Sequence, residues 1–155
     1  MTMIGIRLDK AKSYFRDTVV AQAAGKANVK ALAKFGSFVR RTAKTSIKPA
    51  GKKRKVSLPG QPPRSITGLL KKLLFFIVEP REQNVVIGPI LANNTATAKN
   101  EKTVPETLEH GGRVTFPARG NRKRRTVKIA PRPYMGPAME KEKPKWARLW
   151  ADSVK

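Results

Sequence analysis

The sequence predicts an α+β fold, in which N-terminal helices pack on a small antiparallel sheet, with a C-terminal helix and long basic loops. Apolar residues recur at helical spacing over the first third of the chain and again near its end. Between these segments, short apolar runs alternate with turn residues, which is typical of antiparallel strand pairs. We expect a single domain in three parts: a helical part at 1–47, a basic arm at 48–68, and the sheet with the C-terminal helix at 69–155.

Two helices are expected in the first part. The first runs from about Asp9 to Ala24, and Gly25 is its expected end. Asn28 is the expected N-cap of the second. The apolar stripes that define the two helices are Leu8, Ala11, Phe15, Val19 and Ala23, and then Val29, Leu32, Gly36, Val39 and Ala43.

The arm at 48–68 is expected to be irregular because prolines and glycines interrupt it throughout. A basic run lies inside it: Lys52, Lys53, Arg54 and Lys55. A connection of this length is unusual in a compact domain unless it is functional or disordered.

Two strand pairs follow. Leu73–Val78 and Asn84–Ile87 are joined by a turn at Pro80–Gln83. Arg113–Phe116 and Arg125–Ile129 form the second expected pair, and their connection is rich in Arg and Lys.

Two further helices complete the expected order. A short helix at Val104–Glu109 follows a polar loop at 93–102 and ends at a glycine pair. The last helix spans about Met135 to Val154 and restarts at Pro144, since proline suits a first helical turn. One face of this helix carries Trp146, Leu149, Trp150 and Ser153. Its tryptophans are expected either to pack on the chain's own sheet or to contact a partner.

Charge is the strongest compositional signal. The chain has 34 Lys and Arg against 10 Asp and Glu, a formal net charge of +24. Such a surplus indicates negatively charged neighbours. The second basic run comprises Arg119, Arg122, Lys123, Arg124 and Arg125. Each run fits nucleic-acid phosphates, an acidic groove on a protein or a solvated loop, and neither has the interleaved aromatic residues of a base-stacking platform.

Catalysis finds little support in the sequence. The chain has no cysteine, so a thiolate nucleophile or metal ligand is excluded. His110 lies next to Glu109 in the sequence, but no second histidine or activated serine accompanies the pair. The acids show no metal-ligand spacing. No apolar run approaches the roughly 20 residues of a membrane span. We therefore expect no enzyme activity, no cofactor, no metal and no membrane partner.

Four short motifs follow one another along the chain. They are Pro59-Gly60-Gln61-Pro62-Pro63 with Thr67-Gly68-Leu69-Leu70, then Val85-Val86-Ile87-Gly88-Pro89, then Val104-Pro105-Glu106-Thr107-Leu108-Glu109-His110-Gly111-Gly112, and finally Pro131-Arg132-Pro133-Tyr134-Met135-Gly136-Pro137-Ala138. In the last motif, Tyr134 and Met135 are expected to enter the core, and Arg132 is expected to pair with the Glu109 carboxylate.

In this order the motifs resemble the tail-completion and head–tail joining proteins of long-tailed bacteriophages, also described as neck or minor tail proteins. That family has a Thr-Gly-x-Leu element, a strand with Val-Gly, an E-x-G element and an R-P-[FY]-[LM]-x-P-A element before a C-terminal helix. The resemblance covers most of residues 29–155. The arm is more basic than the family pattern, and the loop at 91–103 replaces a segment that often carries a Tyr-Ala pair.

The resemblance implies a structural virion protein that forms a closed, hexamer-type ring at the neck or tail end and is found in the host cytoplasm during assembly. Its implied partners are copies of itself, the head connector or adaptor, and tail-tube or tail-terminator proteins, with DNA in the channel as a further candidate. The interface candidates are the two basic runs, Trp146 and Trp150, with Phe75 and Phe76 wherever they are left uncovered. The alternative is a basic nucleic-acid-binding protein, ribosome-associated or accessory to DNA packaging, which the charge alone supports.

Overall fold

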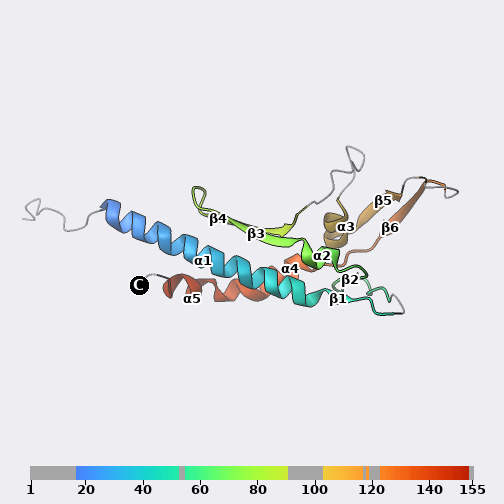
Figure 1. The fold of residues 1–155 in the computed structure, drawn as a ribbon, viewed down its shortest axis with the longest axis horizontal. Helices are drawn as coiled ribbons and strands as arrows, with labels where there is room; N and C mark the ends of the chain where they lie inside the picture. Colours follow the sequence, from blue (N-terminus) through green and yellow to red (C-terminus); the bar gives the residue numbers. More distant parts are fainter. Residues whose placement is uncertain (1–16, 53–54, 91–102, 117, 119–122, 154–155) are drawn as a thin grey trace, which may run out of the picture.

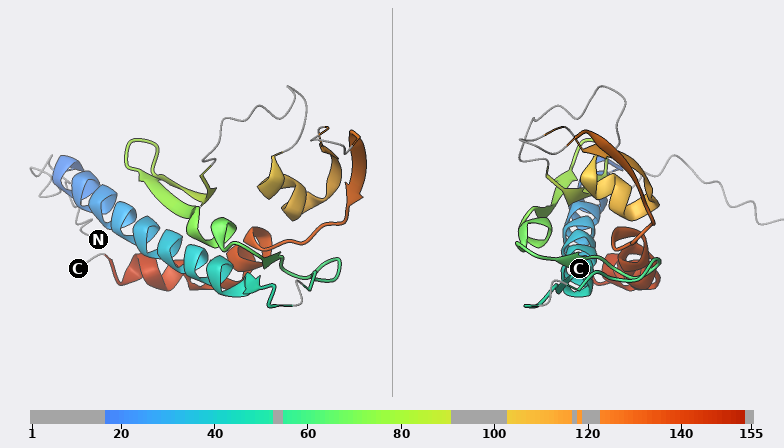
Figure 2. Two further views of the ribbon diagram at one scale, coloured as in Figure 1. Left: turned by 45° about the vertical axis from the view of Figure 1, so that its right-hand side comes forward. Right: turned by 90° about the vertical axis from the view of Figure 1, so that its right-hand side faces the viewer.

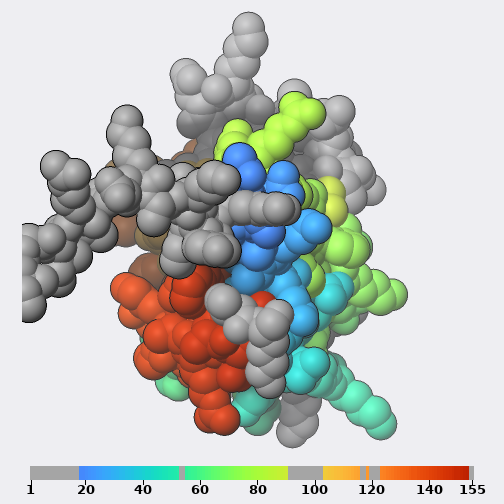
Figure 3. Space-filling view, turned by 90° about the vertical axis from the view of Figure 1, so that its left-hand side faces the viewer, coloured from blue at the N-terminus to red at the C-terminus, as the bar shows by residue number. Residues whose placement is uncertain are grey.

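The computed structural model describes residues 17–52, 55–90, 103–116, 118 and 123–153. A single long helix, α1 (Asp17–Ser46), forms the spine of the molecule (Figure 1). The hairpin β3–β4 lies along one side of α1 and the C-terminal helices lie along another, as the end-on view shows (Figure 3). The predicted α+β class is confirmed.

The prediction of two N-terminal helices is wrong, because α1 is continuous through Gly25 and Asn28. A glycine inside a helix costs about 1 kcal/mol relative to alanine, which is too little to end a helix that is packed on its C-terminal side. That packing begins at Ala27 and continues through Ala31 and Leu32, which are all buried. Residues 9–16 of the predicted first helix lie outside the described residues.

The first predicted strand pair is confirmed as β3 (Leu74–Glu79) and β4 (Asn84–Pro89). Alternate side chains of the hairpin point toward α1, and Gly36 allows the close approach. A Cβ at this position would lie 2.7 Å from the Phe76 ring and 2.9 Å from Val85. The hairpin is therefore seated on the helix at a point where only glycine fits without movement.

The strands form three separate two-stranded sheets. In the arm, β1 (Lys48–Pro49) pairs in parallel with β2 (Arg64–Ser65), so the two ends of the arm are tied together. Two short helices follow, α2 (Leu69–Lys72) after the arm and α3 (Val104–His110) after the first hairpin.

The second predicted strand pair is confirmed as β5 (Gly112–Phe116) and β6 (Arg125–Ile129), which are antiparallel. This hairpin stands next to α3 and projects away from α1 (Figures 1 and 2).

The C-terminal segment consists of α4 (Met135–Glu142), a 3-10 turn η1 (Lys143–Lys145) and α5 (Trp146–Ala151). The predicted restart at Pro144 is confirmed, because this proline lies in η1. Among the described helices, none is both long and apolar enough to cross a membrane. The core runs along α1 and contains Phe35, Val39, Ala43, Ile47, Leu74, Tyr134 and Ala138.

A buried carboxylate links α4 to α1. Glu142 accepts hydrogen bonds from the Lys145 ammonium at 2.6 Å and from the Thr42 hydroxyl at 2.7 Å. These bonds, Lys145 first and then Thr42, hold the pKa of Glu142 below its ordinary value. The carboxylate is thereby kept ionised although it is buried.

Candidate interaction surfaces

The carboxylate of Glu109 holds the start of α4. It accepts hydrogen bonds from three successive backbone N–H groups, those of Tyr134 at 3.0 Å, Met135 at 3.1 Å and Gly136 at 2.7 Å. The next residue, Pro137, has no N–H, so the carboxylate meets every available donor at this helix start. A negative charge at a helix N-terminus is also favoured by the helix dipole. Burial, and then the Glu109 charge, raises the pKa of Tyr134 to about 12, so its phenol stays neutral.

The predicted Arg132–Glu109 ion pair is wrong. Arg132 Nε donates to the Ser57 carbonyl at 3.1 Å, and its Nη1 donates to the Ala130 carbonyl at 3.3 Å. Its backbone N–H donates to the Leu108 carbonyl at 2.6 Å. The physical reason is competition, since backbone donors of α4 already occupy both carboxylate oxygens.

The segment at Pro131 and Arg132 also holds the arm at 48–68. The Gly60 N–H donates to the Pro131 carbonyl at 2.9 Å, beside the Arg132–Ser57 contact. Gly111 has a φ of +71°, and a Cβ there would lie 3.0 Å from Pro131 atoms and from the Ile129 carbonyl. Three of the four sequence motifs therefore meet at one point. We call it the Glu109 junction, and it comprises residues 57–60, 108–111 and 130–136.

The remaining motif residues serve the local fold. The Thr67 hydroxyl accepts from the Leu69 N–H at 3.3 Å, and Gly68, with a φ of 73°, precedes α2. Gly88 pairs with Phe75 across the β3–β4 hairpin. As predicted, Tyr134 lies in the core and Met135 packs against it; Ala138 is also in the core, and Pro133 is half-buried.

The two basic runs lie on different elements. In the arm, Lys52 and Lys55 are exposed, whereas Lys53 and Arg54 lie outside the described residues. On the β5–β6 side, Lys123, Arg124 and Arg125 are exposed. Arg119 and Arg122, which complete this run, are also outside the described part of the chain.

The interface candidate Phe75 belongs to a larger surface, the outer face of the β3–β4 hairpin, opposite α1. It carries Phe75, Ile77 and Val86, which are 41%, 61% and 55% exposed. Ile77 and Val86 are directly paired across the strands, so these side chains form one patch. We call this patch the outer face.

Cations surround one end of the outer face. The Arg40 guanidinium lies 5.3 Å and the Lys44 ammonium 5.8 Å from the centre of the Phe75 ring. Desolvation, followed by the positive charges of Arg40 and Lys71, lowers the pKa of Lys44. The patch is therefore an apolar surface with positive charges at its Phe75 end.

The predicted tryptophan surface is divided in two. Trp146 packs edge-to-face on Phe35, with ring centres 5.3 Å apart, and Leu149 also packs on the core. Trp150 is exposed. Of the two tryptophans, Trp150 is the more exposed, at 42%, and it remains an interface candidate. Phe76, also considered for an interface, faces α1 at Gly36.

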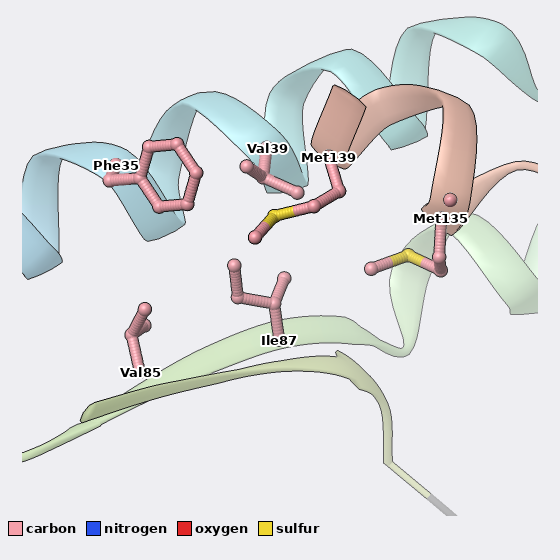
Figure 4. A pocket seen from close by; sticks show the side chains of 7 residues that line it. Phe35, Val39, Val85, Ile87, Met135 and Met139 are labelled. Carbon is pink, nitrogen blue, oxygen red and sulfur yellow. The ribbon is translucent and has the colours of Figure 1, made fainter. Parts of the chain in front are cut away.

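An apolar hollow of about 310 Å³ opens between α1, β4 and α4 (Figure 4). Its lining consists of Phe35, Val39, Val85, Ile87, Met135, Gly136 and Met139. The side chains in Figure 4 converge on it from the helices on one side and the strand on the other. The lining offers no titratable side chain, so this hollow suits an apolar side chain better than a reactive substrate.

A second hollow, of about 330 Å³, brings titratable side chains together, and its lining includes Glu106, Glu109, His110 and Tyr134. His110 is exposed and Glu109 is engaged by the backbone of α4. The described residues contain no group of three or more His, Cys, Asp or Glu side chains placed to hold a metal. Comparison of the chain with protein-family models, with curated proteins and with solved structures finds no match.

Proposed function

We propose that this chain is a structural subunit of a tailed-phage virion, which completes the tail or joins it to the head as a ring of identical copies. The order of the four sequence motifs supports the proposal, because it resembles that of the tail-completion and head–tail joining family. The Glu109 junction adds to this support, since residues of three motifs contact one another there. Turnover chemistry forms no part of the proposed function.

The outer face is the observation that carries the assembly part of the proposal. The apolar run from Leu73 to Val78 is uninterrupted, and such runs are typical of strands that are buried on both faces. Within the described chain, α1 covers one face only, and Ile77 and Val86 remain exposed on the other. Full burial of an exposed side chain of this size is worth about 1.5–3 kcal/mol. The side chains of the outer face are 41–61% exposed, so a neighbour that covers them gains about half of that value from each.

A ring requires two different patches on each subunit, because one patch of a subunit meets another patch of the next. The outer face and the hollow of Figure 4 lie on opposite sides of the β3–β4 hairpin: Val86 belongs to the first, and Val85 and Ile87 belong to the second. Both patches are apolar. We propose that they take part in the heterologous contact between neighbouring copies, and that the head connector and the tail tube are the adjoining partners.

The assembly part is tested by light scattering on the purified full chain and two variants. Val86→Ser removes apolar surface from the outer face, and Val19→Ser removes it from a distant site on α1. The two valines are 55% and 54% exposed, so the pair is matched. We expect the wild type and Val19→Ser to form the same discrete oligomer and Val86→Ser to dissociate at higher protein concentration. A strictly monomeric wild type, or equal behaviour of the two variants, would contradict the proposal.

The virion part is tested in the phage that encodes the chain. We expect a deletion to yield finished heads and tails that do not join, as seen by electron microscopy, and the wild-type protein to be present in purified particles. Joined, infectious particles in the deletion strain would exclude this function even if the chain forms rings in solution.

A further inference from the structure

The β5–β6 hairpin has two chemically different faces. Arg113 lies directly opposite Lys128, and Thr115 lies directly opposite Thr126. Side chains alternate along a strand, so these four residues share one face and Val114 and Val127 occupy the other. The hydroxyls of the two threonines are 3.0 Å apart. We call the first face the cationic face.

The cationic face places like charges together without compensation. Arg113 and Lys128 are both exposed, and like charges directly opposite each other destabilise a strand pair. Residues 110–139 include no Asp or Glu in the sequence. In the described part of the chain, the ion pairs are those of Lys143 with Glu140 and of Lys145 with Glu142, so neither cation of this face has an acidic partner. The juxtaposed charges of Arg113 and Lys128 bring the fold no ion pair, and an external anion would offset their repulsion.

We propose that the cationic face of the β5–β6 hairpin binds the phosphate backbone of duplex DNA. The major groove of B-DNA is about 12 Å wide and admits a two-stranded β-ribbon. Lys, Arg and Thr side chains are common donors to DNA phosphates. The same alternation extended one step before β6 places Arg124, which is exposed, on this face as well.

Uniform charge favours DNA over an acidic protein as the partner. Protein–protein interfaces are depleted of lysine relative to the rest of the surface, whereas protein–DNA interfaces are much more positive. The position of the hairpin fits this role, because it projects from the body of the molecule and its main neighbour there is α3 (Figure 2). A duplex can therefore approach without moving α1 or the outer face. The inference goes beyond the proposed function, because ring assembly through the outer face does not require DNA binding.

The test measures binding of the full chain to a short labelled duplex of arbitrary sequence by fluorescence anisotropy over a series of salt concentrations. A double variant, Arg113→Gln with Lys128→Gln, removes two charges from the cationic face. The matched control, Lys26→Gln with Lys30→Gln, removes two exposed charges from α1. The slope of log Kobs against log[salt] changes by about 0.9 for each phosphate contact, so we expect the hairpin variant to lose about 1.8 of slope and the control to lose little.

Equal losses in the two double variants would show that the net charge, not the hairpin, binds DNA, and would overturn the proposal. A hairpin variant that loses binding to polyglutamate but keeps its binding to DNA would assign the face to an acidic protein instead. Where the double variant does not fold, Arg124→Gln serves, because this residue lies outside the strand ladder, and its expected loss of slope is about 0.9. Light scattering on the same samples reports ring formation separately, so a failure of DNA binding is distinguishable from a failure of assembly.

Discussion

Replacement of Glu109 tests whether its carboxylate organises the start of α4. In Glu109→Ala, three backbone donors lose their acceptor. The N–H groups of Tyr134 and Met135 are part-buried, and leaving a buried donor unpaired costs about 1–3 kcal/mol. The N–H of Gly136 is exposed and regains a partner in water. We expect the free energy of unfolding to fall by about 2–6 kcal/mol in total, since two donors are left unpaired.

Glu109→Gln should be milder, because the amide keeps one oxygen for two of the three donors. A loss of about 1–2 kcal/mol is expected. The control is Glu140→Gln on α4, whose carboxylate is exposed and lies 3.9 Å from Lys143, a surface pair worth at most about 1 kcal/mol. Urea denaturation, followed by circular dichroism and by tryptophan fluorescence, gives the three values. The reasoning is refuted if Glu109→Ala is as stable as Glu140→Gln, or if Glu109→Gln is less stable than Glu109→Ala.

Three further predictions concern packing, pH and the arm. Gly25→Ala should raise the free energy of unfolding by about 1 kcal/mol, because alanine is the better helix former. Gly36→Ala should leave the free energy of unfolding unchanged or lower it, because an overpacking cost of about 1–3 kcal/mol opposes the same gain. Equal thermal stabilisation of the two variants would contradict the close contact at Gly36. The pKa of Glu142 is lowered in the folded state, so its contribution to the free energy of unfolding is present above the ordinary value of 4.5 and is lost as the pH falls through the native pKa. Glu142→Gln should therefore weaken the fall in stability at acid pH, measured by unfolding in a pH series. An equal fall in the variant and the wild type would argue against the buried contact. Arg132→Ala should release the arm from its contact at Ser57. Amide hydrogen exchange around residues 57–60 should then become faster while α1 stays folded. Unchanged exchange at these residues would show that the guanidinium does not hold the arm.

Local patterns account for the elements that the sequence predicted well. The β3–β4 and β5–β6 strands are bounded by turn residues that act within a few positions, and their pairing was predicted correctly. The break at Gly25 was predicted wrongly because a single glycine is a weak local signal. Packing of α1 against β3, β4, α4 and α5 outweighs it.

The Glu109 junction could be predicted only in part. Charge complementarity suggested an Arg132 partner, but the acceptor capacity of the carboxylate goes to backbone donors, which have no sequence signature of their own. Pro137 was an available signal, because a proline inside the first turn marks the helix start and removes one donor. The parallel pairing of β1 with β2 was not predicted, because each strand has only two residues. A strand of two residues is too short to show an alternating apolar pattern.

The apolar run at Leu73–Val78 correctly predicted a strand, but it did not predict that one face of this strand is exposed. An uninterrupted apolar run identifies a strand without saying what covers each face. The structure supplies the missing part, since α1 covers the side of Phe76 and leaves the side of Ile77 exposed. Coverage of the exposed side in the assembled state can be measured directly.

Hydroxyl-radical footprinting of the wild-type chain, with mass spectrometry to quantify labelling, measures whether the outer face is covered in the assembled state. The account predicts that Phe75 and Ile77 are labelled readily in the dissociated chain and are protected in the assembled oligomer, while Val19 on α1 is labelled equally in both. Equal labelling of Phe75 and Ile77 in the two states would contradict the claim that neighbouring copies cover this face.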